Sequence, residues 1–269
     1  MTQAERMIAS AEGHADVVAA RRHVLQDLGW HVVRADDGLQ GSASVTPEMH
    51  VPGTANLRTS ILAVWADVLA GHLAVDTIRP RVPVTLELDV HLYRPAPGDG
   101  LVRGSGQIVK AGRSVFVASV EFDAGEGEPF GFAAATFVPA PDERLTIQMP
   151  KNWDQQAPSS ARLNMPFAER AGCERVAPGV AALSHSDEKL NASNTVNGGL
   201  IALTVEEALL SLLPGASVSS LDMRYLQPAR VGPVVARAEV REGLGRVEVR
   251  DEGNDDRLCV VATSRFFDA

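Results

Sequence analysis

The amino-acid sequence predicts an α+β fold made of two similar units in one chain. Three observations support this prediction: a short internal repeat, an apolar helix-like run ahead of each copy of the repeat, and one strand in which apolar and polar residues strictly alternate. An antiparallel sheet packed on a single long helix satisfies these observations in each half of the chain.

The repeat relates residues 88–98, "LDVHLYRPAPG", to residues 221–232, "LDMRYLQPARVG", with four identical residues at a constant offset of 133. A helix-like apolar run precedes each copy, at 56–74 and at 197–213. Strand-like stretches lie before each run and after each copy of the repeat, in the same order in both halves. Such a shared order of elements indicates a duplicated unit.

Alternation is clearest at residues 84–93, where five apolar residues alternate with five polar or aromatic ones. A period of two indicates a strand with one face in the core and one face nearer water. The pattern places Val84, Leu86 and Leu88 on the buried face, and Thr85 on the wetter face.

Proline content divides the chain. Residues 139–166 contain five prolines with polar residues between them, which is typical of a linker. Residues 4–28 show the spacing of one extra amphipathic helix. The expected organisation is an N-terminal helix at 1–29, a first unit at 30–140, a crossover linker at 141–166 and a second unit at 167–269.

Composition narrows the classes of function. The formal net charge is −9, with 34 acidic and 25 basic residues, which argues against a nucleic-acid-binding surface. We find no uninterrupted apolar run of membrane-spanning length and no signal-peptide pattern, so we expect a cytoplasmic protein without a membrane partner. The two cysteines and seven histidines show no metal-ligand spacing, and we expect neither a metal nor a separate cofactor.

Two carboxylates stand at unusual places in the helix-like runs. The helical neighbours of Glu206 are leucines and alanine, and those of Asp67 are alanines, a valine and a glycine. Burying an unpaired carboxylate is costly. Each acid could lie at a solvated edge, pair with an arginine or backbone donors, or serve chemistry. The Gly198-Gly199 pair before Glu206 would expose the free N–H groups of a helix start to a ligand.

This stretch resembles the hotdog-fold acyl-CoA thioesterases of the PaaI and 4-hydroxybenzoyl-CoA type. Their pattern is Asn-x-x-Gly-x-x-His-Gly-Gly, with an Asp or Glu nine residues beyond the His, as Glu206 lies beyond Asn197. The matching positions in this sequence are Asn191, Asn194, Asn197, Gly198, Gly199 and Glu206. In the first half Asp67 matches the acid, but Pro52, Arg58 and Thr59 stand where the Asn, the His and the first Gly would be.

The resemblance implies a tandem, or double, hotdog: two antiparallel sheets, each wrapped around a long central helix and joined side by side. It also implies composite sites, in which one unit supplies the acid and a hydroxyl and the other supplies the helix start. One site would contain Asp67, Thr85, Asn191, Asn197 and Gly198. The other would contain Glu206 facing Arg58 and Thr59, where an ion pair with Arg58 would make the acid structural.

The activity implied is hydrolysis of an acyl-CoA thioester, with coenzyme A entering as part of the substrate. The acid would act as a general base on water or as a nucleophile, and the helix start would stabilise the oxyanion. Two alternatives remain: a non-catalytic acyl-CoA binding or sensing protein, and a hotdog enoyl-CoA hydratase using Asp67 and His72. The chain could also assemble into a homo-oligomer.

Overall fold

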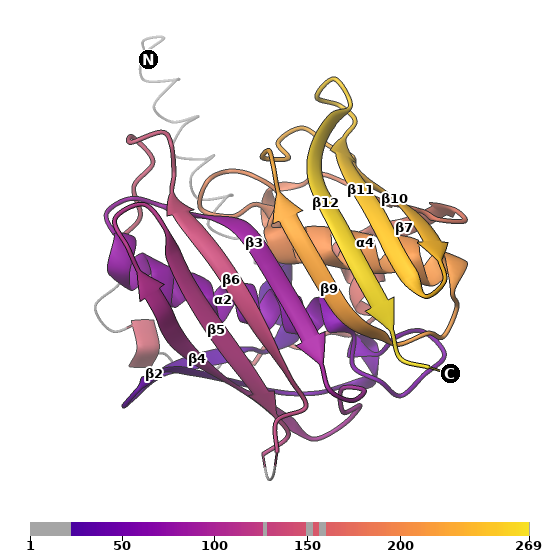
Figure 1. Cartoon of the computed structure of the whole chain (residues 1–269), viewed down its shortest axis with the longest axis horizontal. Coiled ribbons are helices and arrows are strands. Elements are labelled where there is room, and N and C mark those ends of the chain that lie inside the picture. Colours follow the sequence, from indigo (N-terminus) through magenta and orange to yellow (C-terminus); the bar gives the residue numbers. More distant parts are fainter. Residues whose placement is uncertain (1–22, 126–127, 149–152, 156–159, 269) are drawn as a thin grey trace, which may run out of the picture.

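The computed structural model describes residues 23–125, 128–148, 153–155 and 160–268. They form one antiparallel sheet of twelve strands that curves around two long helices (Figure 1). The strand order is β1-β2-β4-β5-β6-β3-β9-β12-β11-β10-β8-β7. Strands β3 and β9 pair at its centre, so the halves of the chain meet there. The double hotdog predicted from the sequence is confirmed.

The strands divide equally between the halves. The first half contributes β1 (His31–Ala35), β2 (Gly38–Ser44), β3 (Pro83–Leu92), β4 (Leu101–Ala111), β5 (Phe116–Asp123) and β6 (Gly131–Pro139). The second half contributes β7 (Cys173–Ala177), β8 (Val180–Leu183), β9 (Val218–Tyr225), β10 (Val234–Arg241), β11 (Leu244–Asp251) and β12 (Arg257–Phe266). In the centre, Leu88 pairs with Met223 and Val90 with Leu221, and all four side chains are buried.

The two long helices are α2 (Thr59–Ile78) and α4 (Gly198–Leu212). The shorter helices are η1 (Val24–Leu28), η2 (Pro47–Met49), η3 (Trp153–Gln155), α3 (Phe167–Ala171) and η4 (Asp187–Lys189). Ser60 at the start of α2 bonds Glu206 in the middle of α4, whereas Val64 lies against Gly199 at the start of α4. The two helices therefore run antiparallel, and the N-terminus of each lies against the side of the other.

Enclosure by the sheet explains why both helices are apolar on most sides. Leu62, Trp65 and Leu69 of α2 and Leu203 and Leu209 of α4 are fully buried. By length and composition alone α2 could span a membrane, with a mean hydropathy of 1.6, a feature that our search for uninterrupted apolar runs missed. Most of that helix is covered by protein, which is the ordinary situation of a core helix.

A β-bulge in β3 overturns part of the predicted alternation. The register with β6 shifts between Thr85 and Glu87, so that Thr85 pairs with the buried Phe137 and Leu86 is the extra residue. Leu86, predicted to be buried, is 37% exposed. Thr85, predicted to face water, turns inward toward α2 and bonds Asp67. Bulges commonly re-aim a side chain beside a functional site.

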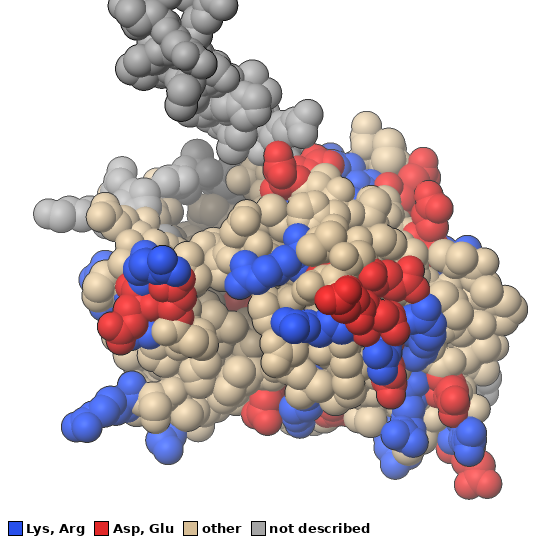
Figure 2. Space-filling view, turned by 90° about the horizontal axis from the view of Figure 1, so that it is seen from above, with Lys and Arg blue, Asp and Glu red and all other residues tan. Residues whose placement is uncertain are grey.

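The crossover segment begins along the start of β3. The Ala140 N–H donates to Val82 O, and the Ile147 N–H donates to Pro80 O. This brings Ile147 close to the C-terminal end of α2, which ends at Ile78. Of the predicted N-terminal helix, residues 24–28 form the 3-10 helix η1, and residues 1–22 lie outside the described residues. Acidic and basic side chains are interspersed on the face shown in Figure 2.

Candidate active site

The environment of Asp67 begins with one face of α2. Asp67, Val68, Gly71, His72 and Val75 follow one another at helical spacing and line a cavity of about 350 Å³. The Thr85 hydroxyl donates to Asp67 Oδ1 at 3.0 Å. Burial raises the pKa of the Asp67 carboxyl to about 6, although the hydrogen bond from Thr85 acts to lower it. The Asp67 carboxyl therefore changes from protonated to ionised just below neutral pH.

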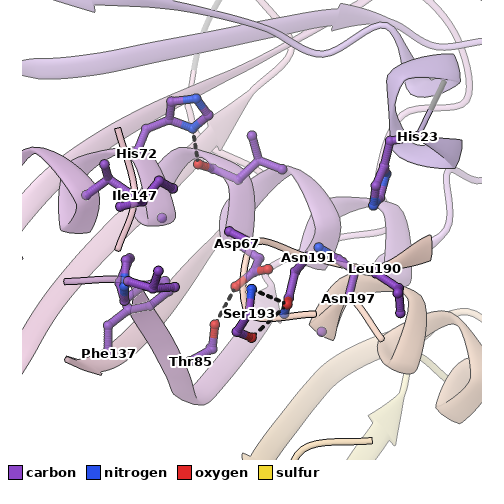
Figure 3. A pocket seen from close by; sticks show the side chains of 17 residues that line it. His23, Asp67, His72, Thr85, Phe137, Ile147, Leu190, Asn191, Ser193 and Asn197 are labelled. Atoms are coloured by element: carbon purple, nitrogen blue, oxygen red, sulfur yellow. Dashed lines mark hydrogen bonds between the residues drawn. The ribbon is translucent and has the colours of Figure 1, made fainter. Parts of the chain in front are cut away.

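The loop before α4 forms the opposite wall, and Asn191 organises it. Asn191 Oδ1 accepts hydrogen bonds from the backbone N–H and the hydroxyl of both Ser193 and Thr195, at 2.7 to 3.2 Å. Its side-chain NH₂ group has no acceptor within the described part of the chain and lines the same cavity as Asp67 (Figure 3). Asn194 adopts φ of 57°, the left-handed conformation that Asn tolerates in place of Gly.

The N-terminus of α4 completes the wall. Asn197 caps the helix, since its Oδ1 accepts from the Gly199 N–H at 2.8 Å. The Gly198 N–H finds no acceptor among the described residues, and Gly198 lines the cavity. A Cβ at Gly198 would lie 3.0 Å from Tyr225 Oη, and at Gly199 it would lie 2.6 Å from Val64 Cγ2. Close packing thus favours glycine at both positions and requires it at the second, and the unpaired N–H of the first remains as a donor at the cavity.

The structure thus brings the residues of the first predicted composite site together around one cavity. They are Asp67, Thr85, Asn191, Asn197 and Gly198. The first half supplies the acid and the hydroxyl, and the second half supplies the amide side chains and the helix start. Figure 3 shows Asp67 between Thr85 and the loop that carries Asn191 and Ser193. The arrangement sets an ionisable carboxylate opposite unpaired N–H donors.

The second predicted constellation is closed. Arg58 Nη1 lies 3.0 Å from Glu206 Oε2, and Arg58 Nη2 lies 2.6 Å from Glu207 Oε1. The Ser60 hydroxyl donates to Glu206 Oε2 at 2.6 Å, and its N–H donates to Oε1 at 3.2 Å. Arg58 is 1% exposed and Glu206 is fully buried. Burial acts to lower the pKa of Arg58, but the two carboxylates raise it.

The difference between the two constellations follows from side chains. Glu206 is one methylene longer than Asp67 and reaches the free N–H group of Ser60 at the start of α2. Arg58 occupies the N-cap position of α2 that Asn197 has in α4, and it fills the space with a guanidinium.

The other two residues predicted near Glu206 do not take part in this ion pair. The Thr59 hydroxyl donates instead to Val218 O at 2.7 Å. Pro52 is exposed. The pairing of Glu206 with an arginine, one of the alternatives left open above, is what the structure has.

Several residues in and beside the cavity are not predicted by sequence reasoning. Ser193 bonds Asn191 Oδ1, and the Tyr225 hydroxyl donates to the carbonyl of Gly198 at 2.9 Å. Burial and the charges of Asp67 and Asp89 raise the pKa of Tyr225 well above its ordinary value. Ile147 arrives from the crossover segment. The only local signal was Ser193 at two residues from Asn191, which is the spacing of an Asx turn.

Metal-binding groups of three or more His, Cys, Asp or Glu side chains do not occur among the residues that the structure describes. The predicted absence of a metal and of a separate cofactor stays a prediction.

Comparison with known proteins bears on the family and on the fold. Residues 59–130 match the model of the thioesterase superfamily, a segment that contains Asp67 and Thr85 but not the loop before α4. No curated protein matches the chain.

Three solved structures resemble the whole fold. An acyl-ACP thioesterase from Bacteroides thetaiotaomicron aligns with a TM-score of 0.58 and 15% identity, over 85% of this chain and 97% of that one. A 12:0-ACP thioesterase from Umbellularia californica aligns with a TM-score of 0.61 and 12% identity, over 85% and 93%. The tesB protein of Mycobacterium avium subs paratuberculosis aligns at 0.57 and 13%, over 91% and 98%.

At these identities the solved structures establish the fold. The chain is therefore a double hotdog whose residues 59–130 carry the sequence pattern of the thioesterase superfamily.

Proposed function

We propose that the chain hydrolyses acyl-CoA thioesters at the cavity between Asp67 and the N-terminus of α4. The observation that carries the proposal is the meeting of an ionisable carboxylate from one half with free N–H donors from the other across one cavity. The match of residues 59–130 to the thioesterase superfamily supports the same reaction.

The Gly198 N–H would donate to the thioester oxygen, aided by the positive end of the α4 dipole. A preorganised donor of this kind contributes about 10²–10³-fold to the rate, because it stabilises the charge that develops on the tetrahedral intermediate. The Asn191 NH₂ group would orient the attacking water or the carboxylate. Tyr225 holds the Gly198 carbonyl and so fixes the angle of the helix start.

Asp67 would take a proton from water or attack the thioester carbon itself. Both roles need the ionised carboxylate. The Thr85 hydroxyl holds one carboxylate oxygen, leaving the other free for the substrate. The raised pKa makes the carboxylate a better base at neutral pH than an exposed aspartate would be.

The hydratase alternative fits the geometry less well. His72 Nδ1 lies 2.7 Å from the Val68 carbonyl of its own helix, and its ring packs on Trp153 at 4.5 Å between centroids. Figure 3 shows His72 directed away from Asp67. Two groups that act on one substrate atom must converge on it, and these two do not.

The function is tested by offering the purified protein a panel of acyl-CoAs at pH 5 to 9 and measuring free thiol release. We expect hydrolysis that rises as pH increases through about 6, the pKa of Asp67, and that levels off above it. Protonation removes the base at lower pH, so the rate falls there. Crotonyl-CoA hydration, measured in parallel, should be absent.

Three outcomes would contradict this account. Binding of acyl-CoA without thiol release would favour the sensor alternative. Hydration of crotonyl-CoA would favour the hydratase. A hydrolysis rate that stays constant from pH 8 down to pH 5, with the protein still folded, would exclude an ionised Asp67 from the rate-limiting step.

A further inference from the structure

We propose that Gly71 determines acyl-chain specificity: its missing side chain opens the space in which an apolar acyl group longer than butyryl lies beside Asp67. The proposal rests on the proposed function, because it assigns a substrate class to the same cavity.

Gly71 lies four residues after Asp67 on α2, so the two share one face of the helix. The cavity wall on this face continues through Val68 and Val75, and the cavity also contacts Gly71. An acyl chain whose carbonyl lies at Asp67 and whose tail follows the helix would pass directly over Gly71.

Glycine is costly at this position and packing does not require it. In the interior of a helix glycine is among the least favourable residues. Its helical backbone conformation is open to any L-residue. A Cβ built on Gly71 meets no described atom within 4 Å, whereas one on Gly199 would lie 2.6 Å from Val64 Cγ2 and one on Gly106 would lie 2.9 Å from Leu69 Cγ. Gly199 and Gly106 have packing reasons, but Gly71 borders open space inside the cavity.

Two cavities meet at the site, so the acyl arm and the thiol arm of a bound thioester can lie in different cavities. A second cavity of about 430 Å³ shares part of its wall with the first. The shared residues are Pro83, Thr85, Asn191, Ser193 and Gly198. A thioester held at this shared wall would direct its acyl arm and its thiol arm into different cavities.

A basic side chain and an amide side chain that occur only in the second cavity assign the arms. Both cavities have mostly apolar walls, but the second also contains Gln227 and Arg230, which suit the amide groups and phosphates of a phosphopantetheine arm. Asp142 in the same wall is paired with Arg144. On the side of Gly71 the first cavity is lined by the apolar side chains of Val68 and Val75, with His72 beside them. The apolar acyl group therefore belongs with Gly71.

The test compares wild type, Gly71→Ala and Gly71→Leu on acetyl-, butyryl-, hexanoyl- and octanoyl-CoA. We expect wild type to favour the longer substrates. The ratio of octanoyl to acetyl kcat/KM should fall about 10-fold in Gly71→Ala, the effect of one misplaced methyl in an apolar pocket, and further in Gly71→Leu. The thermal midpoint of Gly71→Ala should rise by about 2 °C, because alanine favours the helix.

Thr77→Ala is the matched control, since Thr77 lies on the same helix but is exposed and outside the cavity. It should keep the wild-type ratio of rates. An unchanged ratio in both Gly71 variants would overturn the assignment of Gly71, and so would a lower thermal midpoint in Gly71→Ala, which would show that protein fills the space. No thiol release from any substrate by wild type would instead overturn the proposed function itself.

Discussion

Asp67→Asn is expected to reduce thioester hydrolysis by about 10³-fold while the protein stays folded, because asparagine can neither accept a proton from water nor attack a thioester. The substitution keeps the size of the side chain and its ability to accept from the Thr85 hydroxyl. Rates of thiol release at pH 8 and circular dichroism of both proteins check the prediction. Asp76→Asn, on the same helix but in an ion pair with the half-exposed Arg34, should keep the wild-type rate.

The same variant should be more stable than wild type at pH 8. The folded-state pKa of Asp67 lies above its unfolded value of 3.8, at about 6, so the folded protein holds the proton more tightly. Stability contributed by the protonated form is present below pH 3.8 and is lost as pH rises through about 6. A shift of this size corresponds to at most about 3 kcal/mol, and less where solvent in the cavity screens the charge. The gain should disappear at pH 3.8 and below.

An Asp67→Asn protein that hydrolyses thioesters as fast as the parent would rule out the catalytic role assigned to Asp67.

Glu206→Gln is expected to destabilise the protein without removing activity. It leaves the buried Arg58 with a single carboxylate, Glu207, which Arg175 also contacts at 2.6 Å. Breaking a buried ion pair by removing one partner costs about 3–5 kcal/mol, and the hydrogen bonds that glutamine retains place this case near the lower end. A loss of that size lowers the thermal midpoint by roughly 10 °C.

Glu239→Gln is the matched control for this effect. Glu239 pairs with Arg241 at 3.1 Å, and both side chains are exposed, so its loss should cost less than about 1 kcal/mol. Thermal midpoints and hydrolysis rates of the two glutamine variants should therefore separate stability from activity. A Glu206→Gln protein that is folded but inactive would show that the working acid is in the other half.

The elements that the sequence predicted are those with a local signature. The apolar runs became α2 and α4, and the alternating run became β3, because periodicity within a segment reports which face is buried. The left-handed conformation of Asn194 also has a local reason, since few other residues accept it at low cost.

Features that depend on contacts between distant segments were not predictable in the same way. The bulge that turns Thr85 inward is defined only by its register with β6. The role of Ile147 depends on the path of the crossover segment along β3. Tyr225 could be placed under Gly198 only once β9 and α4 were packed together.

The two acids show where sequence reasoning ended. Periodicity placed Asp67 and Glu206 at similar depth and could not say which one is paired; the expectation that Arg58 faces Glu206 came from the resemblance to the hotdog family alone. The difference comes from residues of the opposite half: Arg58 and Ser60 close on Glu206, whereas Gly198 and Asn191 leave Asp67 an open cavity.

The central claim is that each chain contains one working site rather than two. Calorimetric titration of the protein with a thioether analogue of octanoyl-CoA, which cannot be hydrolysed, counts the sites directly. The account predicts one analogue bound per chain, because Arg58 and Glu206 fill the second constellation. Two analogues bound per chain, or binding that survives replacement of Gly198 by a bulky residue, would contradict it.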